Sequence, residues 1–116
     1  MSRLPNAKEA IVDKDKITQY LLSLNHPSGK TKARFFNRFG FDLTNWKNLK
    51  TALLYHAQNN EVINQKQTLF GVKYVIDGLL PTPDGRNPKV RTIWFVETGQ
   101  KQPRFVSAYP LKEKRL

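Results

Sequence analysis

The sequence contains no cysteine, which excludes both a disulfide framework and a metal site built on thiolates. It also lacks any uncharged apolar run approaching the roughly 20 residues of a membrane-spanning helix. Residues 1–6 lack the apolar stretch of about 7–15 residues that a secretory signal needs. These absences lead us to expect a cytoplasmic protein with no membrane partner.

Acidic residues are scarce, since nine Asp and Glu oppose 20 Lys and Arg and leave a net charge of +11. Such an excess attracts polyanions of many kinds. Nucleic acid is the first candidate, although an anionic membrane surface or an acidic protein partner fits the same charge. The 116 residues are the size of a single domain, 1–116, and 13 aromatic side chains provide apolar area for its core.

Hydrophobic periodicity divides the chain into a helical part, 12–59, and a strand-forming part, 61–110. Apolar residues at helical spacing predict helices over 14–24, 32–39 and 45–58. Alternating, β-prone residues predict strands over 72–80, 90–98 and 104–109, with another within 61–70. Helices followed by antiparallel strands predict an α+β fold. We expect about three N-terminal helices packed on a C-terminal antiparallel meander sheet of three to four strands, followed by a basic tail at 111–116.

The sequence has only two histidines, and one of them, His26, begins the run His-Pro-Ser-Gly-Lys-Thr-Lys-Ala at 26–33. We expect this run to be a turn that opens a helix capped by Thr31 or Ser28, where backbone N–H groups and the helix dipole favour an anion. Its Gly-Lys-Thr does not form a P-loop, because Leu24 stands where that motif needs its first glycine. The acidic residues are too scattered to predict a metal site or a cofactor bound through metal.

Cleavage of RNA without a metal ion suits this composition better. In that reaction the neighbouring 2′-OH is the nucleophile, and His, Lys, Arg and Tyr can supply the base, the acid and the cations. An imidazole titrates near pH 6.5, so His26 could transfer a proton in either direction. His26 could also complete the turn without taking part in chemistry. The other histidine, His56, we expect to be a charged helix end or a solvated side chain.

Further candidate catalytic residues come from the second half of the chain. Arg91 lies among apolar residues, so it must either pair with an acid such as Asp77 or Glu97 or face a ligand. Ser107 and Tyr109 are two residues apart and share one face of a strand. There they could position a phosphate, or Tyr109 could cap the edge of the core while Ser107 faces water.

A second group of residues could hold the RNA. Between residues 26 and 60 the chain has six basic residues and one acid, and this one-sided charge favours a polyanion, although a solvated helix face gives the same pattern. We expect Trp94 to stack on a base if it is exposed. The candidate RNA-binding residues are Lys30, Arg34, Arg38, Thr92 and Trp94.

Several short segments together resemble one uncharacterised bacterial domain family. They are Leu-Pro-Asn-Ala at 4–7, Tyr-Leu-Leu at 20–22, the His-Pro-x-Gly-x-x-Lys-Ala run, Thr-x-Trp at 92–94 and Ser-Ala-Tyr-Pro at 107–110. That family occurs as small standalone proteins and within polymorphic toxin systems. It looks like a distant relative of the barnase, EndoU, colicin and RelE-type ribonuclease fold, in which N-terminal helices pack on a meandering antiparallel sheet.

The resemblance implies an active site. In that ribonuclease group a histidine or lysine from the helical region and a hydroxyl-x-aromatic pair on a late strand often act together. Here His26 and Lys32 match the first pattern, and Ser107 with Tyr109 match the second. The EndoU-like pattern has two catalytic histidines, so Lys32 or Tyr109 must supply the second proton transfer.

The leading hypothesis is therefore a metal-independent endoribonuclease toxin without a cofactor. His26 acts as acid or base, Lys32 and Arg91 stabilise phosphate charge, and Ser107 and Tyr109 orient the scissile group. RNA is the expected substrate, and an acidic antitoxin or immunity protein is the expected partner because of the net positive charge. The alternative is a non-catalytic basic module that binds nucleic acid or an acidic protein.

Overall fold

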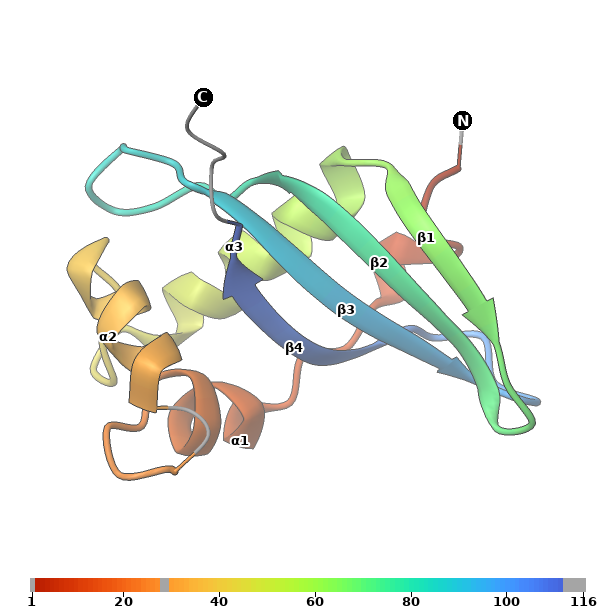
Figure 1. Ribbon diagram of the computed structural model, residues 1–116, viewed down its shortest axis with the longest axis horizontal. Coiled ribbons are helices and arrows are strands. Elements are labelled where there is room, and N and C mark those ends of the chain that lie inside the picture. The colour runs from red at the N-terminus through yellow and green to blue at the C-terminus, as the bar shows by residue number, and fades with distance from the viewer. Residues whose placement is uncertain (1, 28–29, 112–116) are drawn as a thin grey trace.

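The computed structural model describes residues 2–27 and 30–111, with the helices preceding the sheet (Figure 1). The helical part consists of η1 (Ala7–Glu9), α1 (Lys14–Lys16), η2 (Ile17–Leu21), α2 (Lys30–Arg38) and α3 (Trp46–Asn59). The strands are β1 (Val62–Gln67), β2 (Gly71–Leu79), β3 (Lys89–Glu97) and β4 (Arg104–Pro110). They form one antiparallel sheet in the order β1-β2-β3-β4, which confirms the predicted α+β fold. Among the described helices none is long and apolar enough to cross a membrane.

The first helix is shorter than predicted and changes its winding. It was expected over 14–24, but α1 continues directly into the π-helical η2 and ends at Leu21. The Leu22 N–H bonds to the Ile17 carbonyl at 2.8 Å, which closes the wider turn, and Leu22 then leaves helical geometry with φ −110° and ψ 6°. Ile17 and Leu21 are fully buried, so this turn is held against the core. The expected cap at Ser28 and the tail at 112–116 lie outside the described residues.

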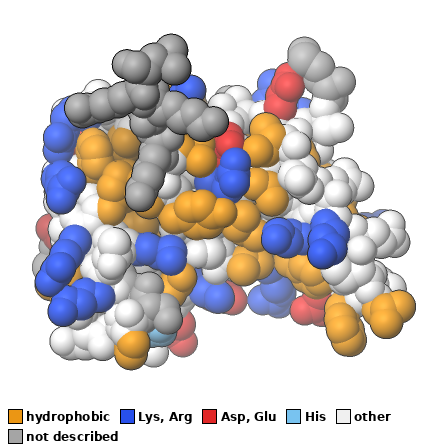
Figure 2. Space-filling view, viewed as in Figure 1, with side chains coloured by type: hydrophobic (Ala, Val, Ile, Leu, Met, Phe, Trp, Pro, Cys, Tyr) orange, Lys and Arg blue, Asp and Glu red, His pale blue; other side chains and the backbone are white. Residues whose placement is uncertain are grey.

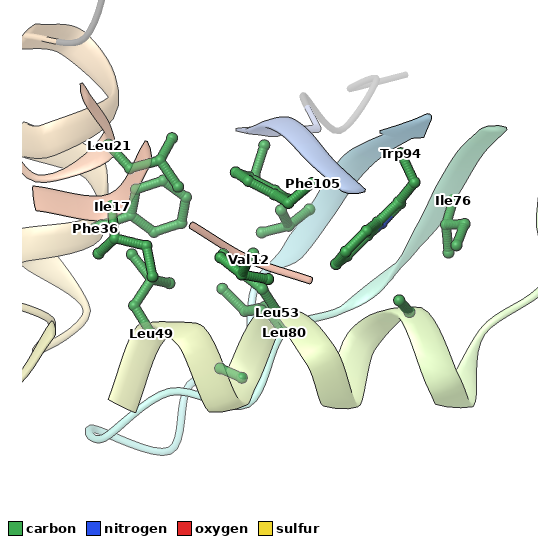
Figure 3. Packing of buried hydrophobic residues seen from close by; sticks show 14 of the residues in the cluster. Val12, Ile17, Leu21, Phe36, Leu49, Leu53, Ile76, Leu80, Trp94 and Phe105 are labelled. Atoms are coloured by element: carbon green, nitrogen blue, oxygen red, sulfur yellow. The ribbon is translucent and has the colours of Figure 1, made fainter. Parts of the chain in front are cut away.

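One face of the sheet packs against α3 and the core, and the other face, which we call the open face, carries no helix (Figure 1). In β3 the core-facing side chains are Val90, Thr92 and Trp94, and Arg91, Ile93 and Phe95 lie between them on the open face. Figure 3 shows Trp94 above α3, and its ring meets Phe105 edge-on with centroids 5.4 Å apart. The period-two alternation predicted for this strand is confirmed.

A β-bulge decides which side chains of β4 reach the open face. Trp94 pairs with Phe105, but the preceding Ile93 pairs with Ser107, so Val106 is an extra residue. Phe105 faces the core, and simple alternation would then put Ser107 on the core side as well. The bulge resets the alternation, so Ser107 pairs with the outward Ile93 and Tyr109 pairs with the outward Arg91.

The core contains a chain of hydrogen-bonded polar side chains centred on His56. This histidine is fully buried, so the expectation of a solvated or helix-end charge is wrong. Its Nε2 donates to the Val90 carbonyl at 2.8 Å, and its Nδ1 lies 3.2 Å from the Thr92 hydroxyl. Trp94 Nε1 in turn donates to that hydroxyl at 2.8 Å. Because Nε2 points at a carbonyl, the neutral Nε2–H tautomer lets Thr92 donate to Nδ1 and satisfies every group in the chain.

This network makes stability depend on pH. Burial lowers the pKa of His56, although its bonds to the Val90 and Gly78 carbonyls and the charge of Asp77 oppose that change. The unfolded chain therefore takes up this proton first, and we expect the free energy of unfolding to fall as the pH drops below about 6.5. Urea titrations between pH 7 and pH 5 should show this slope in the parent and a smaller slope in His56→Gln. Equal slopes in the two proteins would contradict the assignment.

Candidate functional site

The side chain of Tyr20 lies at the centre of a group of polar residues at the edge of β4. Its hydroxyl is 3.3 Å from the Ser107 hydroxyl. The His26 ring meets the Tyr20 ring edge-on, with centroids 5.1 Å apart and planes at 74°. Lys32 Nζ lies 5.2 Å from the centroid of the same phenol ring. One tyrosine therefore joins three side chains that come from a turn, a helix and a strand.

Three members of this group, Tyr20, His26 and Ser107, line a hollow of about 870 Å³ at the surface. Its wall is formed by α1, η2, the turn after η2 and β4, and the lining residues are Asp13, Lys14, Asp15, Lys16, Gln19, Tyr20, His26, Val106 and Ser107. The hollow is open to solvent and large enough for a nucleotide-sized group. We call this group, Tyr20, His26, Lys32 and Ser107, the Tyr20 site.

The local folding of the chain explains why these residues meet. Ile17 and Leu21 anchor η2 in the core, which leaves Tyr20 half-buried at the border between core and solvent. The carbonyl of His26 accepts the N–H of Lys30 at 3.0 Å and thereby joins the turn to the start of α2. In α2 the buried Ala33 and Phe36 fix the helix against the core, and Lys32 lies partly buried beside Tyr20.

The electrostatic surroundings of Tyr20 favour its ionised form. Partial burial raises the pKa of the phenol, but the hydrogen bonds from Lys32 and Ser107 and the charges of Lys32 and Lys16 together bring it below its ordinary value. The Lys16 ammonium lies 5.9 Å from the ring centroid. A phenol with a lowered pKa gives up its proton more readily, which suits it to act as a general acid.

Removing the Lys32 charge should raise the pKa of Tyr20. Lys32→Met loses both a hydrogen bond to the phenol and a nearby cation, while the burial that raises the pKa remains. The titration of Tyr20 can be isolated as the ultraviolet difference between each protein and its Tyr20→Phe counterpart. Lys30→Met is the matched control, because Lys30 is an exposed lysine of the same helix. An equal pKa for Tyr20 in the two lysine variants would contradict the assigned contact.

The structure brings together three of the five predicted catalytic residues. His26 and Ser107 line the same hollow, and Lys32 reaches their common neighbour Tyr20. Tyr20 itself was missed as a site residue, because its spacing with Ile17 and Leu21 marked it as part of a buried helix face. The available signal was its hydroxyl, which needs a partner when the ring is half-buried.

The other two predicted catalytic residues, Arg91 and Tyr109, lie elsewhere on the open face. Arg91 donates to Asp77 through Nε at 2.7 Å and through a terminal nitrogen at 2.8 Å. This bidentate pair and the neighbouring Tyr109 raise the pKa of Arg91 and keep its charge neutralised by the carboxylate. Of the two alternatives for Arg91, the acid partner is the one observed. Both residues line a separate hollow of about 340 Å³, together with Ile63, Asn64, Lys66, Lys73, Val75 and Ile93.

Two of the predicted RNA-binding residues are buried in the core. Thr92 and Trp94 have no exposed surface and are joined to His56 by hydrogen bonds, so the expectation that they touch RNA is wrong. The alternation in β3 was predicted correctly, but the buried face was taken for the exposed one, because a sequence pattern alone does not tell which face is buried. Their role is to fill and order the core.

The remaining three predicted RNA-binding residues are exposed on α2. Lys30, Arg34 and Arg38 are four residues apart and so form one ridge of the helix. Lys32 leaves the helix on another side, towards Tyr20. The ridge is further supported at its end, where the Arg38 carbonyl accepts from Arg86 at 2.8 Å. Contact of this ridge with RNA stays a prediction.

Comparison with known proteins gives a family and a fold. Residues 3–112 match the family described as "Domain of unknown function (DUF6883)". The chain belongs to this family. A chain of the contact-dependent growth inhibition toxin–immunity protein complex from Klebsiella pneumoniae 342 has a similar structure, with a TM-score of 0.70 and 15% sequence identity over 92% of this chain and 97% of that chain. No curated protein matches significantly.

For this member of the DUF6883 family the likeness to the Klebsiella pneumoniae chain concerns the fold, because the identity is only 15%. The expected membership of an uncharacterised domain family is confirmed. Its relation to the barnase, EndoU, colicin and RelE-type ribonucleases stays a prediction. Within 2–27 and 30–111 no three His, Asp or Glu side chains gather closely enough to hold a metal ion.

Proposed function

We propose that this chain is a metal-independent endoribonuclease of the toxin type, with the Tyr20 site as its active site. The observation that carries the proposal is the convergence of Tyr20, His26 and the Ser107 hydroxyl in one open hollow. The Tyr20 and His26 ring centroids are 5.1 Å apart, and Lys32 lies against the Tyr20 ring. Metal-free RNA cleavage requires a base, an acid and a cation, and these side chains supply two proton-transfer groups and one positive charge. Tyr20 takes the second proton-transfer role that was predicted for Lys32 or Tyr109.

The proposed reaction follows from the chemistry of these side chains. The neutral His26 imidazole removes the proton of the 2′-OH, and the 2′-oxygen attacks the adjacent phosphorus. The bond from phosphorus to the 5′-oxygen breaks, and the Tyr20 hydroxyl donates its proton to that leaving oxygen. The products are a 2′,3′-cyclic phosphate and a 5′-OH, and proton exchange with water restores both side chains.

Two neighbours assist this proton transfer. Lys32 lies beside the phenol, where its positive charge stabilises both the pentacoordinate phosphate and the phenolate that forms. Ser107 holds the Tyr20 hydroxyl in place from β4. Arg91 has no part in this step, because Asp77 already engages its guanidinium.

The biological setting is proposed from the fold and the charge. The structure of similar fold is a toxin–immunity protein complex, which supports a toxin-related role for this single domain in the cytoplasm, where RNA is available. The net charge of +11 supports pairing with an acidic antitoxin or immunity protein. The same charge also fits a non-catalytic basic module, which is the second candidate.

One experiment separates the two candidates. Purified protein is incubated with a labelled RNA in excess chelator, and with a DNA of the same sequence as control. The proposal predicts RNA fragments with 2′,3′-cyclic phosphate ends and intact DNA, because only RNA carries the nucleophile. RNA that is bound but left intact would favour the non-catalytic module and overturn the catalytic proposal.

A further inference from the structure

A row of three basic side chains and one aromatic ring crosses the open face of the sheet, beside the Tyr20 site but outside it. The strand register places Lys66 opposite Lys73, Lys73 opposite Phe95 and Phe95 opposite Arg104, so the row includes one residue from each strand. Neighbouring core-facing residues such as Tyr74 and Trp94 point the other way, which puts this row on the open face. Figure 2 looks onto this face and shows hydrophobic side chains flanked by Lys and Arg.

The charges of this row are poorly balanced. Lys66 and Lys73 are directly opposed, and like charges in that position destabilise a sheet. Within 2–27 and 30–111 neither lysine forms an ion pair, and both are exposed. Arg104 lies 3.6 Å from the exposed Asp13, and Glu97 lies two residues beyond Phe95 on β3, opposite Gly71. Two adjacent cations without an acid are suited to an anionic ligand.

The row also contains an aromatic ring held in a fixed position. Phe95 is partly buried and packs over Gly71, where an added Cβ would lie 2.8 Å from Phe95 Cε2 and 2.2 Å from the Val96 carbonyl oxygen. The missing side chain of Gly71 therefore makes room for the ring. An aromatic ring on the sheet surface can stack with a base while the lysines in the same row hold the backbone.

The row lies within reach of a strand bound at the Tyr20 site. Ser107, Ile93 and Val75 are aligned across the sheet, and Lys73 is two residues from Val75 along β2. From the usual spacing of strands and residues, Lys73 lies about 12 Å from Ser107. A nucleic-acid strand spans that distance within a few nucleotides.

We propose that Lys66, Lys73 and Phe95 form a binding site for an unpaired segment of the RNA substrate. The identity of the ligand as substrate rests on the proposed ribonuclease function. The lysines contact phosphates, and Phe95 stacks with a base that must be free of a partner strand, because a paired base has both faces covered. The chain should therefore prefer single-stranded RNA to a duplex.

Binding of a cleavage-resistant RNA tests this site separately from catalysis. The probe is a labelled 2′-O-methyl RNA oligonucleotide, single-stranded or annealed, measured by fluorescence anisotropy over a range of salt. Lys66→Gln with Lys73→Gln should reduce the slope of log affinity against log salt by about 1.4, from roughly 0.7 per phosphate on a single strand. Phe95→Leu should weaken single-strand binding by about fivefold or more and leave duplex binding unchanged.

The matched control is Lys8→Gln with Lys47→Gln, which removes two exposed charges elsewhere. If the row variants bind RNA like this control, the site is wrong, even where the parent protein still cleaves RNA. If they bind RNA like the control but lose binding to poly-L-glutamate, the row is a docking surface for an acidic protein instead. If the row variants lose RNA binding as predicted but the parent protein does not cleave RNA, the binding site is retained and the proposed catalysis is overturned.

Discussion

His26→Ala should lower the rate of RNA cleavage by about 10²-fold or more, because the proposed base is lost. His26 lines the hollow together with Ser107 and contacts Tyr20, and no other histidine can replace it, since His56 is fully buried and hydrogen-bonded to Val90. The measurement is the single-turnover rate on a labelled RNA with enzyme in excess. With enzyme in excess the RNA is fully bound, so the single-turnover rate reports the chemical step and not binding.

The control for this variant is Asn25→Ala, which alters the exposed residue immediately before His26. It should cleave RNA at close to the parent rate. Both variants should unfold at the parent's urea midpoint, which shows that the loss is chemical. A His26→Ala protein that is folded and cleaves at the parent rate would remove His26 from the mechanism.

Trp94→Ala should lower the free energy of unfolding by about 3–5 kcal/mol, the usual cost of removing a large aromatic side chain from a core. The Trp94 ring is fully buried between α3 and Phe105 (Figure 3). The substitution also removes the N–H that donates to the Thr92 hydroxyl in the His56 network. For a domain of ordinary stability this loss is a large fraction of the total.

Phe70→Ala is the comparison for this effect, because that ring is 77% exposed at the turn between β1 and β2. It should change the free energy of unfolding by less than about 0.5 kcal/mol. Urea denaturation at neutral pH measures both. Equal losses in the two variants would show that Trp94 is not a core residue and would reopen its predicted role in stacking on RNA.

The sheet could be predicted because its strands show strong local patterns. Alternation in 90–98 predicted β3, and apolar residues at helical spacing predicted α3 close to its observed bounds. Which face of β3 is buried was not available from the same pattern, and Thr92 and Trp94 were misplaced for that reason. The face depends on what packs against the sheet, which is a tertiary property.

The candidate site was predicted only in part, because its members meet through features with little sequence signal. His26, Lys32 and Ser107 stood out by residue type and by their resemblance to known patterns. The bulge at Val106, which puts Ser107 on the open face, and the π-helical turn that carries Tyr20 have no such signal. Pairing of Arg91 with Asp77 follows from their being opposite in β2 and β3, a register that could not be assigned in advance.

The central claim is that Tyr20 and His26 act on the same reaction, and a double-mutant comparison tests it most directly. Single-turnover cleavage rates are measured for Tyr20→Phe, His26→Ala and the double variant, each with an unfolding midpoint near that of the parent. Groups that act as a unit are strongly non-additive, so the double variant should be about as slow as the slower single variant. Two single variants with the parent's rate, or losses that simply multiply in the double variant, would contradict one shared active site.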